Sequence, residues 1–345
     1  MSVSLAIKYR PSTWEDVTEQ SAIKTILTQQ LDTKTFKHAY LFCGPAGCGK
    51  TTCARIFAND INKGLGNPIE LDAASNNGVD DVRNIIQQSK TQSLDSEFKI
   101  FIIDECHALS NSAWQAMLKI IEEPPAKSIF IFCTTDPQKI PKTILSRVQR
   151  YDFQRISQQG IVERLLFICS EELKISCIDA KLDAVQYIAK IADGGMRDAI
   201  TLLDKCLSYN ADLTLENAVR ALSTVRYDEM FVLTFSVLEK RSNEAIELIE
   251  NIYNRGTDLK QFVKMYSQFV LNINKYLLGC NEKYIDIPFT EDNVQKLRQI
   301  NEDDYLTVLH LLNMLVKLDA NIKYSATVKA DVEAMFLLEI AGEIE

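Results

Sequence analysis

Residues 44–51 constrain the fold of this chain more than any other segment. They read Gly-Pro-Ala-Gly-Cys-Gly-Lys-Thr, which fits the pattern G-x-x-x-x-G-K-[ST] of a phosphate-binding loop. An apolar run precedes the loop and a helical pattern follows it, as such a loop requires. Lys50 is expected to reach the outer phosphates of ATP, and the Thr51 hydroxyl to hold Mg²⁺. The residues expected to contact the nucleotide here are Gly44, Pro45, Ala46, Gly47, Cys48, Gly49, Lys50, Thr51 and Thr52.

A pair of carboxylates supplies the second half of such a site. The apolar run of residues 99–104 ends in Asp104, and Glu105 follows it. Asp104 is expected to bind the magnesium shell, and Glu105 to orient or deprotonate the attacking water. Taken alone, the pair is equally typical of a solvated strand end. Beside the phosphate loop, two carboxylates with different tasks indicate hydrolysis rather than storage of ATP.

The alternation of short β-rich runs with helical patterns predicts an α/β P-loop domain with a parallel sheet. The expected strands are Ala39–Cys43, Ile69–Asp72, Lys99–Asp104, Ser128–Thr134 and Arg150–Phe153. The expected helices between them are Thr51–Asn62, Val79–Gln88 and Ser112–Glu122. Pro124 and Pro125 end the third helix, because proline cannot donate the next helical hydrogen bond.

The remainder of the chain is predicted to be helical. Residues 157–222 have the pattern of several short helices, interrupted at Gly194-Gly195. Longer amphipathic helices are expected at Tyr227–Lys240, Ser242–Arg255 and Asp304–Tyr324.

Composition and the placement of charge exclude some classes of protein and narrow the part of the chain where nucleic acid could bind. No apolar run approaches the ~20 residues of a membrane helix, and no signal peptide is visible, so a cytoplasmic location is expected. The net charge of −9 is unevenly placed: residues 1–157 hold 18 basic and 17 acidic side chains, and residues 223–345 hold 13 and 20. Contact with a nucleic-acid backbone therefore belongs to the first part, where it would be local and modest. The nine cysteines include no C-x-x-C pair and are expected to be reduced thiols rather than zinc ligands or disulfides.

Six motifs occur in a specific order along residues 8–141. They are Lys-Tyr-Arg-Pro at 8–11, the loop and its strand at 38–51, Asp-Ala-Ala-Ser-Asn-Asn-Gly-Val at 72–79, Asp-Glu-Cys-His-Ala-Leu-Ser at 104–110, Ile-Glu-Glu-Pro-Pro at 121–125 and Thr-Thr-Asp-Pro-Gln-Lys-Ile-Pro at 134–141. Together they closely resemble the gamma/tau family of bacterial DNA polymerase III clamp-loader subunits. The resemblance covers nearly the whole chain and is densest in residues 5–155.

The resemblance implies three domains. They are an AAA+ ATPase domain at 1–157, a helical lid at 158–222 and a helical collar at 223–345 that assembles subunits. It also implies roles for side chains outside the phosphate loop. Thr135 matches the first sensor of the γ-phosphate, Arg197 the second sensor on the lid, and Arg147 an arginine finger that reaches the ATP of a neighbouring subunit. The residues that match the adenine enclosure are Tyr9, Arg10, Pro11, Val17 and Thr18.

Each of these roles has a plainer alternative. Arg147 alone is compatible with a surface ion pair, Arg197 with a charge at a helix end, and Thr135 with a turn residue. The sequence also departs from the family in three places. A short link at residues 63–68 stands where the family commonly has a four-cysteine zinc module, so no zinc is expected. Ser-Arg-Val at 146–148 replaces Ser-Arg-Cys, and the end at Glu345 is typical of a short gamma-type form, compatible with a phage-encoded version.

The expected partners follow from the same resemblance. They are further copies of the chain and other clamp-loader subunits in a ring or spiral of five, a sliding clamp, and primer-template DNA, with no membrane. Ser75, Asn76, Asn77 and Arg83 are expected to face DNA, although an ordinary helix-capping turn is equally typical of this segment. The expected function is to open the clamp on ATP binding and to release it on DNA after hydrolysis. The rival hypotheses are another AAA+ motor, such as a Holliday-junction helicase or helicase loader, and a nucleotide-binding scaffold without turnover.

Overall fold

The computed structural model of the chain describes residues 3–342 except 92, 94, 174–180, 223–226 and 324. It divides into two compact units, residues 1–213 and 214–345. The domain boundary that we predict near residue 222 lies beside residues that are not described, and the predicted collar ends at Glu345, outside the described residues. The predicted boundary near residue 222 and the predicted end of the collar therefore remain predictions.

A five-stranded parallel sheet forms the centre of the first unit. The strands β1 (Ala39–Cys43), β2 (Ile69–Asp72), β3 (Lys99–Asp104), β4 (Ser128–Thr134) and β5 (Gln149–Asp152) lie in the order β2-β3-β4-β1-β5. All five residues of β1 are buried, as expected of a parallel strand that is covered on both faces. The predicted parallel sheet is therefore confirmed, and β5 lies one residue earlier than we predict.

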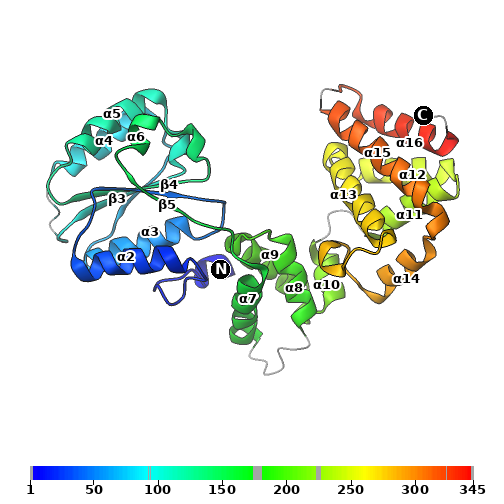
Figure 1. The fold of residues 1–345 in the computed structure, drawn as a ribbon, viewed down its shortest axis with the longest axis horizontal. Helices are drawn as coiled ribbons and strands as arrows, with labels where there is room; N and C mark the ends of the chain where they lie inside the picture. Colours follow the sequence, from blue (N-terminus) through cyan, green and yellow to red (C-terminus); the bar gives the residue numbers. More distant parts are fainter. Residues whose placement is uncertain are drawn as a thin grey trace. The chain divides into compact units, whose positions relative to one another are not determined.

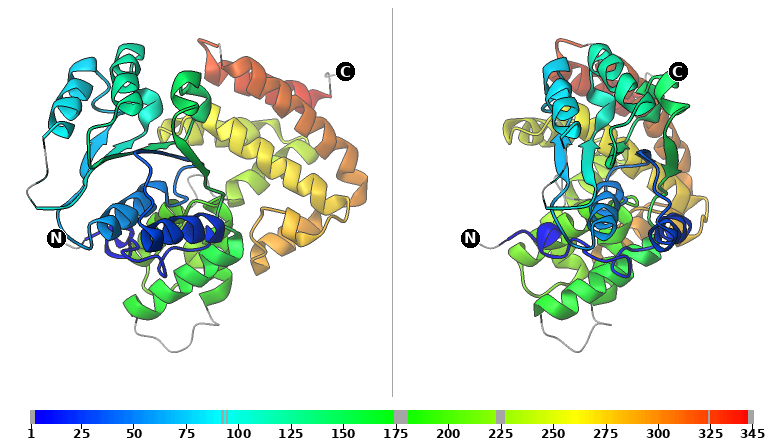
Figure 2. Two further views of the ribbon diagram at one scale, coloured as in Figure 1. Left: turned by 60° about the vertical axis from the view of Figure 1, so that its left-hand side comes forward. Right: turned by 90° about the vertical axis from the view of Figure 1, so that its left-hand side faces the viewer.

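Two layers of helices cover this sheet (Figure 1). The helices α2 (Ser21–Thr33) and α3 (Lys50–Ile61) lie on one face, and α4 (Val79–Ser89), α5 (Asn111–Glu122) and α6 (Lys142–Leu145) lie on the other. The side chains of each strand alternate between the two faces. Tyr40 and Phe42 therefore join the core beside α3, while Leu41 joins the core beside α5. Figure 2 shows both layers from two further directions.

The remaining helices of the first unit are short or follow the sheet. The short α1 (Leu5–Lys8) precedes α2 in sequence, and α7 (Gln158–Leu173), α8 (Leu182–Ile191) and α9 (Met196–Tyr209) form the helical part after β5. The 3₁₀ turns η1 (Cys106–Ala108) and η2 (Pro137–Lys139) follow β3 and β4. Gly194, with φ 82°, lies in the break between α8 and α9, where we predict an interruption.

The second unit is helical throughout its described residues. Its helices are α10 (Leu215–Leu222), α11 (Tyr227–Leu238), α12 (Ser242–Asn254), α13 (Leu259–Leu277), α14 (Glu291–Gln299), α15 (Tyr305–Ile322) and α16 (Val328–Ala341), with 3₁₀ turns η4 (Glu282–Tyr284) and η5 (Glu302–Asp304). An apolar core built around α13 and α15, including Tyr266 and Leu315, holds the unit together. The predicted helices at 227–240, 242–255 and 304–324 correspond to α11, α12 and α15.

Candidate nucleotide site

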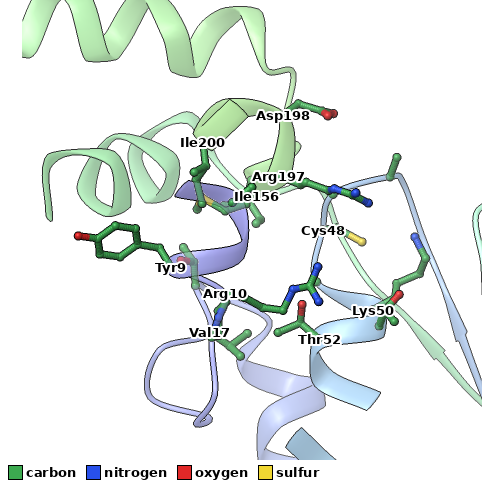
Figure 3. Close-up of a pocket in the computed structure, with 18 of the residues that line it drawn as sticks. Tyr9, Arg10, Val17, Cys48, Lys50, Thr52, Ile156, Arg197, Asp198 and Ile200 are labelled. Carbon is green, nitrogen blue, oxygen red and sulfur yellow. The ribbon is translucent and has the colours of Figure 1, made fainter. Parts of the chain in front are cut away.

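A cavity of about 490 Å³ lies where β1 and β3 end and α3 begins. In open parallel sheets, ligands bind at the carboxyl ends of the strands, and this volume is within the ~300–1,000 Å³ of ligand pockets. Most of the residues predicted to bind nucleotide line it. They are Tyr9, Arg10, Pro11, Val17, Thr18, Ala46, Gly47, Cys48, Gly49, Lys50, Thr51, Thr52, Asp104, Glu105 and Arg197. Figure 3 shows this cavity with lining side chains as sticks, ten of them labelled.

Two glycines give the loop between β1 and α3 its shape. Gly47 has φ 71° and Gly49 has φ 102°, a backbone region that other residues rarely adopt. Gly49 is the N-cap of α3, and no atom lies within 4 Å of the place where its Cβ would be. The loop therefore presents backbone N–H groups and the start of a helix to the cavity, which is a binding site for anions.

Lys50 is a buried cation without a carboxylate partner among the described residues. Lys50 is only 6% exposed, and its Nζ donates to the carbonyl oxygens of Gly44 at 2.9 Å and Pro45 at 2.7 Å. Gly44 and Pro45 themselves do not line the cavity, and their predicted contact with nucleotide stays a prediction. A buried charge held only by carbonyls favours an anionic ligand.

The hydroxyl of Thr51 and the carboxylate of Asp104 lie together. Thr51 Oγ1 donates to Asp104 Oδ2 at 2.8 Å, and the other carboxylate oxygen accepts from the backbone N–H of Glu105 at 3.0 Å. A hydroxyl and a carboxylate oxygen beside a phosphate-binding loop are the ligand types that Mg²⁺ takes from P-loop proteins. The residues present therefore fit a divalent cation.

The carboxylate of Glu105 is held by two neighbours. Thr135 Oγ1 donates to Glu105 Oε2 at 3.0 Å, and His107 Nδ1 lies 3.2 Å from the same oxygen. The backbone of Glu105 has φ 45°, which places its side chain beside η1 rather than along β3. Thr135 thus lies next to Glu105, although it does not line the cavity. Sequence reasoning missed His107, whose signal was its position two residues after Glu105.

Cationic side chains outnumber carboxylates around the cavity. The cations are Arg10, Lys50, Arg55, Arg164 and Arg197, and the carboxylates are Asp104, Glu105 and Asp198. Burial and the like charges of Arg55 and Arg197 lower the pKa of Arg10. Figure 3 shows the guanidinium groups of Arg10 and Arg197 pointing toward the phosphate loop. A bound polyanion would relieve this repulsion, so the charge of the cavity fits a nucleotide triphosphate.

Sequence reasoning also missed Arg55 and Arg164. Arg55 lies one helical turn after Thr51, so the i, i+4 spacing on α3 was an available signal. Arg164, on α7, belongs to none of the recognised motifs. Its Nη2 donates to the backbone oxygen of Tyr9 at 3.1 Å, which ties α7 to the segment predicted to enclose adenine.

Tyr9 is one of the residues that line the cavity, and its hydroxyl is directed to α7. The hydroxyl donates to Glu172 Oε1 at 2.6 Å, and Lys8 Nζ contacts the same oxygen. Figure 3 shows the Tyr9 ring extending away from Lys50. The hydrogen bonds from Lys8 and Tyr9 hold the pKa of Glu172 below its usual value. The N-terminal segment therefore connects the nucleotide cavity to the helices after the sheet.

The phosphate loop also contacts the start of α9 directly. The Met196 N–H donates to the Gly47 carbonyl at 3.0 Å, and a Cβ on Gly47 would lie 2.9 Å from the Cα of Gly195. No side chain fits between these two glycines. The position of α9, which carries Arg197, is therefore coupled to the shape of the loop.

Gly47→Ala should lower the free energy of unfolding more than Gly64→Ala does. Both glycines have positive φ, which costs another residue roughly 1–2 kcal/mol, but a Cβ on Gly64 meets no atom within 4 Å. The overpacking at Gly195 should add about 1–3 kcal/mol for Gly47→Ala alone. Chemical denaturation of the two variants measures this difference, and equal losses would show that the contact with α9 does not constrain the loop.

The predicted finger Arg147 lies outside the cavity. It follows α6, and its Nε forms an ion pair with Glu122 Oε1 at 2.8 Å. Nothing in one copy of the chain brings its guanidinium to the phosphate loop.

The predicted DNA segment is also separate from the cavity. Ser75 and Asn76 bond to Asp72, while Arg83 pairs with Asp80 at 2.8 Å. The first turn of α4 contains Asp80 and Asp81, and their charge opposes phosphate at this helix N-terminus. Asn77 is exposed and contributes its carbonyl to the Ser110 N–H at 3.2 Å.

Two kinds of feature are absent from the described residues. They contain no group of three or more His, Cys, Asp or Glu side chains arranged to hold a metal ion. None of their helices has both the length and the apolar character that crossing a bilayer requires. The eight cysteines among the described residues are free thiols, and Cys177 lies outside those residues. Burial raises the pKa of the thiols near the loop, including Cys48.

Two protein families match the first unit. Residues 67–157 match the family described as DNA polymerase III, delta subunit. Residues 160–212 match the family described as DNA polymerase III clamp loader subunit, ATPase lid domain.

Curated relatives match a larger part of the chain. The DNA polymerase III subunit tau of Bacillus subtilis is 40% identical over 279 residues, which cover 74% of this chain and 49% of the relative. The gamma/tau subunit of Mycobacterium tuberculosis is 34% identical over 287 residues, which cover 75% of this chain and 49% of the relative. The DNA polymerase III subunit gamma of Buchnera aphidicola is 30% identical over an alignment of 369 residues, with 99% of both chains covered. The chain spans about half the length of the first two relatives.

Among solved structures, the fold is similar to a branch-migration motor. The Holliday junction motor RuvB of Thermotoga maritima superposes with a TM-score of 0.53 and 17% identity, covering 72% of this chain and 86% of that one. At this identity the likeness concerns the fold alone, and it agrees with the predicted P-loop domain followed by helices.

Proposed function

The chain belongs to the gamma/tau family of DNA polymerase III subunits, and from this premise we propose that it is a clamp-loader ATPase subunit. One observation carries the proposal. A single cavity brings together the buried cation Lys50, the Thr51–Asp104 pair and a Glu105 that is held by Thr135. Phosphoryl transfer depends mainly on positioning and on electrostatic stabilisation, and this cavity has groups for both.

Each side chain of the cavity has a proposed task. Lys50 binds the outer phosphates of ATP, and Arg197 contacts the γ-phosphate from α9. Mg²⁺, when bound, would be held by Thr51 and Asp104 and would offset phosphate charge. Glu105 accepts a proton from the attacking water or orients it, and Thr135 fixes the direction of its carboxylate. Tyr9, Pro11, Val17 and Thr18 enclose the adenine, while the direction of the Arg10 guanidinium in Figure 3 supports a contact with phosphate. We propose no structural zinc.

Arg147 has its proposed task in another copy of the chain. An arginine supplied by a neighbouring protomer stabilises the charge of the transition state and makes hydrolysis depend on assembly. Its position outside its own cavity supports this role. We propose a ring or spiral of five subunits, formed from copies of this chain and other loader subunits in the cytoplasm, with residues 223–345 as the collar.

The proposed cycle is a switch. ATP binding between subunits orders the spiral, which opens a sliding clamp at primer-template DNA, and hydrolysis releases the clamp. DNA contact is proposed for Ser75, Asn76, Asn77 and Arg83. Because Arg83 is paired with Asp80, its contact with a phosphate requires exchange of that largely exposed ion pair, which is weak in water.

ATPase assays of the assembled complex test the proposed function. Hydrolysis should rise when clamp and primed DNA are both present, and Lys50→Ala should abolish it. Stimulation by branched DNA without any clamp would support a translocating motor instead. An assembled complex that binds ATP but never turns it over would identify a scaffold.

A further inference from the structure

The guanidinium of Arg147 has described contacts at Nε and at Nη1. Its Nε forms an ion pair with Glu122 Oε1 at 2.8 Å. Nη1 donates to the Thr143 carbonyl at 2.8 Å and to Ser146 Oγ at 3.0 Å. A guanidinium has five N–H groups, and these two hydrogen bonds use the pair on Nη1. Within the part of the chain that the structure describes, the two N–H groups on Nη2 have no bonded partner.

Glu122 is well placed to fix the plane of this guanidinium. It is the last residue of α5, whose buried side chains include Trp114, Met117 and Ile121 and which therefore is a rigid part of the first unit. Thr143 and Ser146 belong to α6 and its C-cap, on the same stretch of chain as Arg147. Glu122 is thus the only one of the three described partners that comes from another element.

The Arg147–Glu122 ion pair contributes little to folding. Its side chains are 39% and 43% exposed, and exposed ion pairs are screened by water. The pair therefore affects where the guanidinium points more than how stable the domain is. The ion pair is recorded at Nε and no described contact involves Nη2, so Glu122 can orient the arginine while the Nη2 group stays without a partner.

We propose that Glu122 is a positioning residue for the arginine finger: it holds the Arg147 guanidinium with its Nη2 edge directed outward for the γ-phosphate bound by a neighbouring copy. This inference rests on the proposed role of Arg147. Glu123 provides a matched control, because it is the adjacent carboxylate and its side chain has no hydrogen bond or ion pair in the described structure.

The test compares four single variants and one double variant in the assembled complex with clamp and primed DNA. Small misplacements of a catalytic group can cost up to ~100-fold in rate, and Glu122→Ala should lower kcat about 10-fold, with the KM for ATP within about two-fold of wild type. Glu122→Gln should lie between Glu122→Ala and wild type, because the amide keeps the shape of the side chain beside Nε but removes its charge. Glu123→Gln should match wild type. Arg147→Ala is the reference, and Glu122→Ala added to it should cause no further loss.

The outcomes separate the inference from the proposed function. If Arg147→Ala is inactive while Glu122→Ala keeps the wild-type kcat, Glu122 does not position the finger, and the proposed function stands. A faster Glu122→Ala would show that Glu122 restrains the finger, and equal losses in Glu122→Gln and Glu123→Gln would show a general effect of charge. Either result overturns the inference. If Arg147→Ala has wild-type activity, the finger itself is wrongly assigned.

Discussion

Arg147→Ala should lower ATP hydrolysis by the assembled complex about 1,000-fold, since an arginine finger is worth ~10³–10⁵ in rate. The affinity for ATP should stay within about two-fold of wild type, because Arg147 does not line the cavity of its own chain. Steady-state ATPase rates with clamp and primed DNA, together with nucleotide binding by fluorescence, measure the two effects separately.

Arg150→Ala is the control for this prediction. Arg150 is an exposed arginine on β5, bonded to Asp152 at 2.7 Å, and it has no place in the cavity. Its variant should hydrolyse ATP at the wild-type rate. If Arg147→Ala weakened ATP binding by an unassembled chain as much as it lowered hydrolysis, Arg147 would act within its own protomer and the proposal of a shared site would be wrong.

Glu105→Gln should keep ATP binding and lower the rate of hydrolysis by about 100- to 10,000-fold, the range of general acid–base catalysis. The amide has nearly the same shape as the carboxylate, and its oxygen can still accept from Thr135 Oγ1, which lies 3.0 Å from Glu105 Oε2. What the variant loses is the negative charge that attracts a proton. Single-turnover experiments with bound ATP measure the chemical step directly.

The binding of clamp serves as the control for Glu105→Gln. The variant should form a stable ATP complex with clamp and DNA, because binding precedes the step that it blocks. Wild-type single-turnover rates would remove Glu105 from the mechanism. Loss of ATP affinity together with a lower melting temperature would mean that the substitution disturbs the loop after β3 instead.

Local sequence patterns predicted most of the first unit. Residues 39–43 and 99–104 are continuous apolar runs, which only a strand covered on both faces can bury, and the bounds of β1 and β3 agree with them. The spacing of the phosphate-loop motif identifies Lys50 and Thr51 as site residues, and the position at the end of β3 identifies Asp104. By contrast, α2 escaped prediction because its sequence is largely polar, with only Ile23 and Leu27 buried.

Contacts set by an unusual turn or by packing between elements were less accessible to sequence reasoning. The approach of His107 to Glu105, two residues earlier, accompanies the positive φ of Glu105, which its residue type does not signal. The pairing of Arg147 with Glu122 depends on how α6 packs beside α5. Neither contact follows from the period of one helix or strand.

The most direct measurement mixes Glu105→Gln and Arg147→Ala chains in one assembly. A Glu105→Gln copy lacks the base but carries the finger, and an Arg147→Ala copy lacks the finger but keeps an intact cavity. Where the first lies beside the second in head-to-tail order, a complete site forms, and random mixing should make about one quarter of the interfaces competent. We predict that ATPase activity returns to about that fraction of wild type. Mixed complexes verified by native mass spectrometry that stay as inactive as either variant alone would contradict a site shared by two protomers.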